Sequence, residues 1–187
     1  MATTHRNARF LMAGERAAIR RLNAWDEADF MAAAERSTAF HAPWVSPPRT
    51  TEAFASAVRR SRRRDVRTFL VLSREHRALA GAVTLSQIFL GNFRSCYAGY
   101  YAFAPWEGCG LMTEGLQLVV RYAFTKLGLH RVEANIQPAN LRSRSLAERC
   151  GFRQEGFSPG YLYIDGAWRD HERWAIRAED LPGSANL

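Results

Sequence analysis

Hydrophobic and polar positions along this chain follow two different spacings. Alternation at every second residue is typical of half-buried strands, whereas apolar residues at every third or fourth position predict helices with one buried face. The pattern predicts strands over Ala18–Leu22, Arg67–Ser73, Ala78–Phe89, Ser95–Phe103, Arg131–Ile136, Phe152–Phe157, Tyr161–Ile164 and Trp168–Ile176. It predicts helices over Asp26–Arg36, Thr51–Arg63, Leu111–Leu127 and Asn140–Cys150. The expected fold class is therefore α+β, a mixed α/β arrangement.

Turn-forming residues separate these elements. Proline has no amide proton to continue a helix, so Pro43, Pro47 and Pro48 separate the first two helices. The polar stretch Arg74–Arg77 joins two strands and predicts a hairpin. The pair Asp165–Gly166 predicts a second, tight hairpin near the end of the chain, because both residue types tolerate positive φ.

Length and composition favour one domain. With 187 residues, of which 47% are hydrophobic, the chain can bury one substantial core. We expect a single domain over residues 1–187, with a loose tail after Asp180. No run of eighteen apolar residues is present, and the stretch Met1–Ala13 is polar and carries arginine. A membrane span or a secretory signal needs an apolar run, so we expect a cytoplasmic protein without a membrane partner.

The three cysteines do not form a recognisable framework. Cys96, Cys109 and Cys150 are odd in number and contain no C-x-x-C pair. Reduced thiols fit this pattern better than disulfides or a zinc site. No metal site is expected.

The chain is strongly basic, with a formal charge of +8 and a pI near 10.1. Clustered cations attract polyanions without reading sequence. The densest run is Arg59–Arg64, interrupted by Ser61, and nearly all of the positive charge is arginine, since Lys126 is the only lysine. A solvated helix end and a patch facing RNA or the ribosome both fit this run.

Candidate chemistry converges on the loop Trp106–Gly110. Glycines just before a helix allow backbone amides to turn toward an anion, and the positive end of the helix dipole adds to the attraction. The loop contains neither the Gly-Lys-Ser/Thr sequence of nucleoside triphosphate loops nor the G-x-G-x-x-G of dinucleotide loops. A plain structural turn and a different kind of phosphate-binding loop remain open.

The residues after this loop narrow the choice. The chain continues as Gly108-x-Gly110-Leu111-Met112-x-Glu114, a helix, a strand ending near Asn135, Asn140-x-x-Ser143-x-x-Leu146 and Cys150-Gly151-Phe152. This order resembles the core of the GNAT acyltransferase superfamily. Two further motifs are Ser37-x-x-Phe40-x-x-Pro43-Trp44 and Tyr161-Leu162-x-Ile164-Asp165-Gly166-x-Trp168-Arg169-Asp170-His171. With these, the resemblance extends from about Leu22 to Ile176 and is closest to the ribosomal-protein-alanine N-acetyltransferase branch.

The resemblance implies both a fold and a donor. The fold is a central, mostly antiparallel twisted sheet with flanking helices, in which two parallel strands splay apart at Ser95–Phe103 and Arg131–Ile136. The donor is acetyl-CoA, with coenzyme A as product, and its pantetheine arm lies in the gap. Unpaired amides in the gap are ready-made donors for the arm and for the thioester oxygen. The implied cofactor-binding residues are Tyr101, Ala102, Phe103, Glu107, Gly108, Cys109, Gly110, Leu111, Met112, Asn135, Asn140 and Ser143.

The resemblance also implies a proton donor for the departing thiolate. Many family members have a tyrosine seven residues after the Asn, but this chain has Ala147 there, which cannot donate a proton. Ser143, three residues after Asn140, is the expected replacement. Its alternative role is that of a serine in the first helical turn that satisfies a backbone group.

The base remains unassigned at this stage. The branch often has an acidic residue immediately before the tyrosine that matches Tyr161, but this chain has Gly160 there. Glu155 is either a base that acts through a water or a plain surface carboxylate. His171 is either a base or the donor of a structural hydrogen bond across the hairpin. Tyr161 and Tyr163 are the expected substrate-binding residues.

The expected function is transfer of an acetyl group to a protein N-terminal α-amine, such as that of a ribosomal protein, by direct attack in a ternary complex. Two alternatives remain open. One is a small amine as acceptor, such as an amino acid, a polyamine or an antibiotic. The other is a coenzyme-A-binding or nucleic-acid-binding module without catalysis. Because acceptor pockets vary on a shared scaffold, the resemblance defines the donor better than the acceptor. Ribosome association is a further expectation, and both a monomer and a homodimer are compatible with the sequence.

Overall fold

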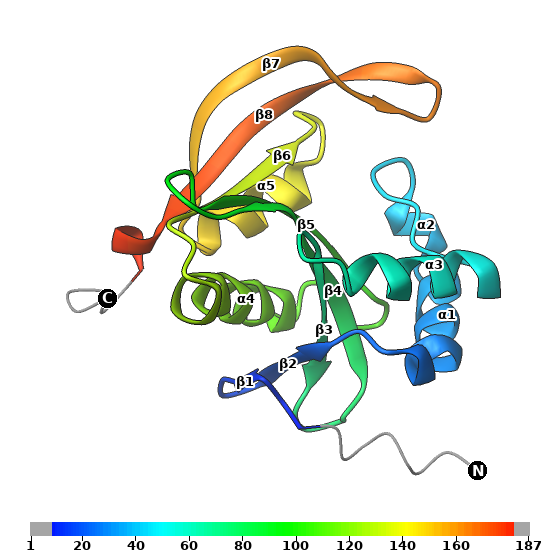
Figure 1. The fold of residues 1–187 in the computed structure, drawn as a ribbon. Coiled ribbons are helices and arrows are strands. Elements are labelled where there is room, and N and C mark those ends of the chain that lie inside the picture. The colour runs from blue at the N-terminus through cyan, green and yellow to red at the C-terminus, as the bar shows by residue number, and fades with distance from the viewer. Residues whose placement is uncertain (1–8, 182–187) are drawn as a thin grey trace.

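One twisted sheet forms the centre of the protein, and the computed structural model describes residues 9–181 (Figure 1). Its strands, in the spatial order β1-β2-β3-β4-β5-β6-β8-β7, are β1 (Met12–Ala13), β2 (Ala17–Arg21), β3 (Arg67–Ser73), β4 (Leu79–Phe89), β5 (Ser95–Ala102), β6 (Arg131–Ile136), β7 (Arg153–Ile164) and β8 (Ala167–Arg177). Every neighbouring pair is antiparallel except β5 and β6. The expected mixed α/β class is confirmed. The expected loose tail after Asp180 lies, apart from Leu181, outside the described residues.

Helices cover both faces of this sheet. They are α1 (Glu27–Arg36), α2 (Thr38–His41), α3 (Thr51–Ser61), α4 (Leu111–Leu127) and α5 (Leu141–Arg149), with 3₁₀ turns at Ala24–Asp26 and Ala178–Asp180. Figure 1 shows α4 and α5 on one side and α1 to α3 on the other. None of the helices in residues 9–181 is long and apolar enough to cross a membrane.

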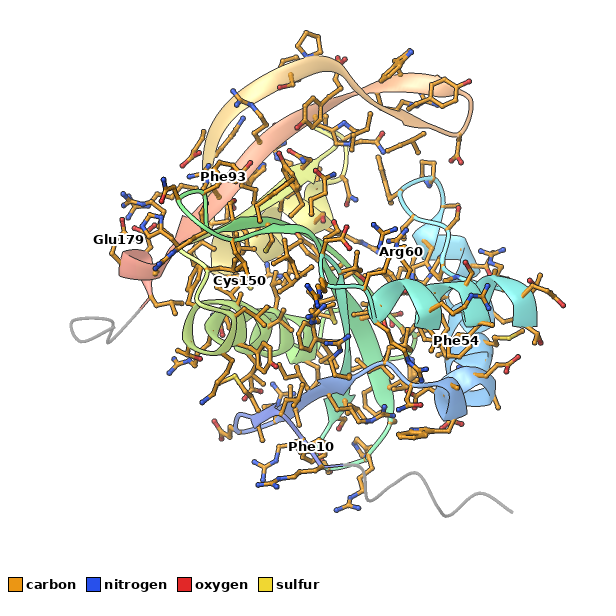
Figure 2. The ribbon with its side chains drawn as sticks, in the orientation of Figure 1. Phe10, Phe54, Arg60, Phe93, Cys150 and Glu179 are labelled. Carbon is orange, nitrogen blue, oxygen red and sulfur yellow. The ribbon has the colours of Figure 1, made fainter. Side chains whose placement is uncertain are left out.

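The strand β3 shows why the sheet has two cores. Its central residues Phe69–Leu72 are apolar without interruption, as expected for a strand buried on both faces. Phe69 and Val71 join the core beneath α4, whereas Leu70 and Leu72 join the core beneath α1 and α3. Figure 2 shows the side chains that fill the space between sheet and helices, including Phe54 of α3. β3 therefore packs against helices on both faces of the sheet.

The parallel pair β5–β6 is joined over a very short distance. Its register runs only from Ser95–Tyr97 of β5 to Arg131–Glu133 of β6. Beyond that point β5 stays paired with β4, and β6 stays paired with β8. The two strands diverge, as the resemblance implied, and a gap opens toward their carboxyl ends.

The sequence pattern predicted most elements and missed three features. The bounds of β3, β6 and α4 are as expected, whereas β1 and α2 were not expected, because two and four residues are too few to show a period. The strands predicted on either side of Pro159 form the single strand β7, with an irregular register between Ser158 and Leu162. β7 is an edge strand, where a missing amide proton is tolerated. At the predicted turn, Asp165–Gly166 has φ of +49° and +77°, as expected for a tight hairpin.

Close packing holds α4 against the sheet at Gly115. A Cβ added to Gly115 would lie 2.4 Å from Cγ1 of Val71. The carboxylate of Glu114, one residue earlier, accepts hydrogen bonds from the amides of Arg16 (3.0 Å) and Ala17 (2.9 Å) at the start of β2. These contacts fix where the first turn of α4 lies relative to the strands.

We expect Gly115→Ala to lower the free energy of unfolding by about 1–3 kcal/mol, because the added methyl overpacks the contact with Val71. The higher helix propensity of alanine offsets only about 1 kcal/mol of this loss. Urea unfolding of Gly115→Ala, Val71→Ala and the double variant measures the coupling. Val71→Ala removes the opposing methyls, so the double variant should be more stable than the sum of the single effects by about 1 kcal/mol. Additive effects would contradict the packing described here.

Candidate functional site

A cleft of about 1210 Å³ lies where β5 and β6 diverge. Its walls come from α2, the carboxyl end of β5, the loop before α4, the end of β6, the start of α5 and the β7–β8 hairpin. Of the predicted site residues, the structure places these in the lining: Tyr101, Ala102, Glu107, Gly108, Gly110, Met112, Asn135, Asn140 and Ser143. Residues from distant parts of the chain therefore meet at the gap between the two strands.

The loop before α4 exposes backbone amides at one end of the cleft. Gly108 has φ of +74° and Gly110 has φ of +86°, values that strain any residue with a Cβ. Gly110 is the N-cap of the seventeen-residue α4, and no side chain caps the helix there. The amides of the first turn are thus available to an anion, with the helix dipole in support.

Arginines border this end of the cleft. Arg16 lies at this end, since a Cβ at Gly110 would lie 3.4 Å from its Nη1, and Arg142 and Arg149 of α5 also line the cleft. The exposed Glu107 opposes them with one negative charge in the loop itself. The arrangement suits a phosphate-bearing ligand held mainly by backbone amides and flanked by guanidinium groups.

Two side chains from the first helices hold the end of β5. The Nε2 of His41 donates to the carbonyl of Ala102 (2.7 Å), and the amide of Ala104 donates to Oγ of Ser37 (2.9 Å). Both side chains are fully buried, and burial lowers the pKa of His41. A carbonyl only accepts, so the neutral imidazole carries its proton on Nε2. The polar groups of a strand end that has left its neighbour are satisfied in this way.

Tyr100 connects the two sides of the gap. Its hydroxyl donates to the backbone carbonyl of Ser143 (3.0 Å), which joins β5 to the first turn of α5. Burial raises the pKa of both Tyr100 and the neighbouring Tyr101. Tyr100 therefore keeps its proton at neutral pH, and the hydrogen bond persists.

The start of α5 places the hydroxyl of Ser143 at the wall of the cleft. The Oδ1 of Asn140 accepts from the amide of Ser143 (3.1 Å) and caps the helix. The side chain of the half-buried Ser143 is hydrogen-bonded to the hydroxyl of Tyr100, and this bond opposes the rise that burial causes in the pKa of Tyr100. Asn140 therefore takes the capping role that was considered for Ser143, and the Ser143 hydroxyl lies beside that of Tyr100.

Asn135 supplies an unpaired acceptor inside the cleft. Its Oδ1 is fully buried and has no partner. A buried polar atom without a partner costs about 1–3 kcal/mol, so an N–H group entering the gap would relieve that cost. Secondary amides, such as those of a pantetheine arm, supply such N–H groups. Together with the loop amides, this atom makes the cleft a suitable site for coenzyme A.

Several predicted residues lie elsewhere. The side chains of Phe103 and Leu111 are in the core, where only their backbone faces the loop and strand end, and Sγ of Cys109 donates to the carbonyl of Trp106 (2.8 Å). Tyr161 and Tyr163 do not line the cleft, whereas Leu162 and Ile164 do. Successive strand residues point to opposite faces, which accounts for the difference. Tyr163 instead packs against Trp168 on the exposed side of the hairpin.

The three thiols are free and differ in exposure. Burial raises the pKa of Cys96 and of Cys150 to about 12. Cys150 lies at the end of α5 beside α4, with Sγ 3.4 Å from the carbonyl of Thr113 (Figure 2). No group of three or more potential metal ligands comes together in the described part of the chain.

Comparison with known proteins agrees with this geometry. The family model described as the acetyltransferase (GNAT) domain matches residues 16–153, which include the β5–β6 gap, the loop and α5. The chain belongs to this family. The predicted GNAT resemblance and its fold are thus confirmed.

Individual relatives refine the picture. The [ribosomal protein uS5]-alanine N-acetyltransferase of Escherichia coli (strain K12) is 40% identical over 110 residues, which cover 58% of this chain and 57% of that protein. The chain therefore spans little more than half the length of the curated relatives it matches. Among solved structures, Mycobacterium smegmatis RimJ in complex with CoA-disulfide is 29% identical, with a TM-score of 0.81 over 90% of this chain and 85% of that chain. Spermidine N-acetyltransferase from Vibrio cholerae in complex with CoA and spermine is 21% identical, with a TM-score of 0.74 over 88% and 97%, and shares the fold.

We expect Gly108→Ala to weaken coenzyme A binding at least tenfold, because a Cβ at positive φ distorts the loop whose amides face the ligand. Gly128→Ala is a matched control. Gly128 also has positive φ and open space around its Cβ position, but it ends α4 away from the cleft. Both variants should lose similar stability. Isothermal titration with coenzyme A separates them, and equal affinities would contradict a role for the loop.

Proposed function

We propose that this GNAT protein transfers the acetyl group of acetyl-CoA to a protein N-terminal α-amine, such as that of a ribosomal protein. The observation that carries the proposal is the gap between β5 and β6, which has uncapped helix amides at one end and the unpaired Oδ1 of Asn135 inside it. The name of the Escherichia coli relative supports the class of acceptor.

The chain's own groups would bind and orient the donor. The amides of Glu107–Met112 would hold the pyrophosphate, Asn135 and Asn140 would contact the arm, and the backbone of Tyr101–Phe103 would face the thioester. When bound, acetyl-CoA supplies an activated acyl group on a thiol leaving group. Preorganised amides that face the developing negative charge on the acyl oxygen lower the barrier. Orientation in the cleft adds the advantage of an intramolecular reaction.

Ser143 is the proposed proton donor to the leaving sulfur. Ser143 lines the cleft, and Asn140 and Tyr100 hold its backbone on either side. Its side chain is hydrogen-bonded to the hydroxyl of Tyr100, a second protonated group from which Ser143 could recover a proton given to sulfur. Proton transfer by a positioned group contributes about 10²–10⁴-fold to rate.

The lining of the cleft favours a singly charged amine as acceptor. Glu107 is the only carboxylate among the described residues that line it, and Glu107 lies at the phosphate end. A polyamine carries several positive charges and needs several acids to bind. Leu162 and Ile164 instead give the hairpin wall an apolar character that suits peptide side chains. A small amine is the second candidate, because spermidine acetyltransferases are among the structural neighbours.

An arginine cluster at the end of α3 supports an approach to ribosomal assemblies. Arg59, Arg60, Arg62, Arg63 and Arg64 are all exposed, and Arg63 forms an ion pair with Asp65 (3.0 Å). Arg60 is labelled on α3 in Figure 2. One or two cations complement the dipole at the end of a helix. Five arginines exceed that number, and their combined field attracts phosphates. We therefore include ribosome association in the proposal.

Release of free thiol from acetyl-CoA tests the proposed acceptor. We expect release with peptides that carry the N-termini of ribosomal proteins, and little with a matched panel of polyamines, amino acids and aminoglycosides. Blocking the α-amine of an active peptide by formylation should abolish the signal. Release with small amines alone would replace the proposed acceptor, and silence with intact coenzyme A binding would point to a module without catalysis.

For the proton donor, we expect Ser143→Ala to reduce kcat on the order of 10²-fold, because the leaving thiolate loses its proton source. The dissociation constant for coenzyme A should stay within about threefold, since the backbone of α5 is unchanged. Ser56→Ala on the exposed face of α3 is the control for removing a hydroxyl from a helix. A parallel loss of affinity and kcat, or no loss of either, would rule out the assigned role.

A further inference from the structure

His171 of β8 combines burial with a position in the wall of the cleft. The side chain is 2% exposed, yet it belongs to the lining. Asn135 pairs with Arg173, and His171 is two residues from Arg173 along the strand. Paired residues share a face, and so do residues two apart, so His171 and Asn135 lie on the same face of the sheet. The imidazole therefore lies on the side of the gap from which Asn135 faces the cleft.

A backbone carbonyl determines the tautomer of His171. Its Nδ1 lies 2.9 Å from the carbonyl oxygen of Arg169. A carbonyl only accepts, so Nδ1 carries the proton and the lone pair of the neutral ring is on Nε2. Among the residues that the structure describes, Nε2 has no hydrogen-bond partner. The expected hydrogen bond across the hairpin is thus replaced by one along the same strand, which leaves a basic nitrogen uncommitted.

The other histidine of the cleft is less suited to accept a proton. His41 has the opposite tautomer, with its lone pair on a fully buried Nδ1 that has no partner. Burial and the charge of Arg49 lower the pKa of His41. A proton placed on that nitrogen would have no acceptor among the described residues. His41 therefore serves to position Ala102.

Carboxylates on β6, β7 and β8 are already engaged. Arg131 forms ion pairs with Glu133 (2.7 Å) and with Glu155, and the second pair holds the pKa of Glu155 below its usual range. This engagement makes Glu155 a poor base, and Glu155 does not line the cleft. Asp170 accepts a hydrogen bond from the amide of Gly160 (2.7 Å). Glu172 accepts from Nε1 of Trp174 (3.0 Å).

Tyr161 is an aromatic neighbour of His171. The ring of Tyr161 lies 6.0 Å from the imidazole. Its side chain is hydrogen-bonded to Tyr97. Desolvation is the main cause, and this bond the second, of a rise in the pKa of Tyr97 to about 12. Arg169 and Arg173 flank His171 along β8. These neighbours supply no competing base, because each is a phenol or a guanidinium group.

We infer that His171 is the general base of the reaction, a role that rests on the proposed function. Nε2 takes one proton from the ammonium group of the acceptor and passes it to solvent. The nitrogen lone pair freed in this way forms the new C–N bond to the acetyl carbon while the C–S bond breaks, and its electron pair stays on sulfur. The sulfur gains a proton from Ser143, and the second proton lost by the nitrogen replaces the one that Ser143 has given. One amide, one thiol and one released proton balance the reaction.

Two substitutions separate a base from a structural histidine. His171→Asn keeps an N–H at the position of Nδ1 and can retain the hydrogen bond to Arg169, whereas His171→Gln keeps a neutral polar atom near the position of Nε2. Neither can take a proton. Both variants should lose about 10²-fold or more in kcat/KM at pH 7, with coenzyme A affinity unchanged. His130→Asn, on the surface beside Glu179, is the matched control.

The pH profile gives a readout that a structural role would not change. An α-amine has an ordinary pKa of about 8, so above that value the acceptor arrives neutral and needs no base. The deficit of both variants relative to the wild type should therefore shrink as the pH rises from 7 to 9.5. Wild-type activity in His171→Asn, or a deficit that is independent of pH, would overturn the inference. A wild-type protein that releases no thiol with any acceptor would instead overturn the proposed function.

Nitrogen NMR of the histidine-labelled wild-type protein tests the inference without any substitution. The chemical shifts distinguish the two neutral tautomers. We expect a proton on Nδ1 for His171 and on Nε2 for His41. A proton on Nε2 of neutral His171 would remove the proposed lone pair and overturn the assignment, whatever the variants show.

Discussion

The rest of the structure depends on the end of the parallel ladder between β5 and β6 after Tyr97 and Glu133. Each strand keeps its other neighbour, so the sheet stays continuous while one seam opens. Backbone groups that leave a ladder need new partners. His41 and Ser37 supply them at the end of β5, and the hydroxyl of Tyr100 bridges the seam to α5. The cleft is thus an interruption in a sheet, stabilised by side chains from elements far away in the chain.

Backbone groups form one end of the cleft, and side chains form the other. The end beside α4 consists largely of backbone: glycines with positive φ, uncapped amides and a helix dipole. The end beside the β7–β8 hairpin consists of side chains, including His171 and Leu162. Binding groups of the backbone are kept through most substitutions. The binding groups of a wall made of side chains change whenever one of its residues is replaced. This difference explains why a sequence resemblance identifies the donor more securely than the acceptor.

The parts that could be predicted from sequence are those with local causes. The period of residues 111–127 and the glycine that follows predicted α4 to the residue, and Gly108 and Gly110 marked the loop before it. The contacts that organise the cleft join residues 61 apart (His41 and Ala102) and 43 apart (Tyr100 and Ser143), and no local pattern indicates such pairs. The tautomer of His171 depends on where a single carbonyl points, which only the folded strand determines.

Pro159 and the irregular register around it have a consequence for assembly. β7 is the outer strand of the sheet and could add a strand from another molecule along its free edge. Proline has no amide proton to donate, and the irregularity between Ser158 and Leu162 interrupts the regular spacing of the ladder along β7. Both features disfavour the pairing of an edge strand with a strand of another molecule. The long outer strand of this sheet is therefore a poor template for edge-to-edge aggregation.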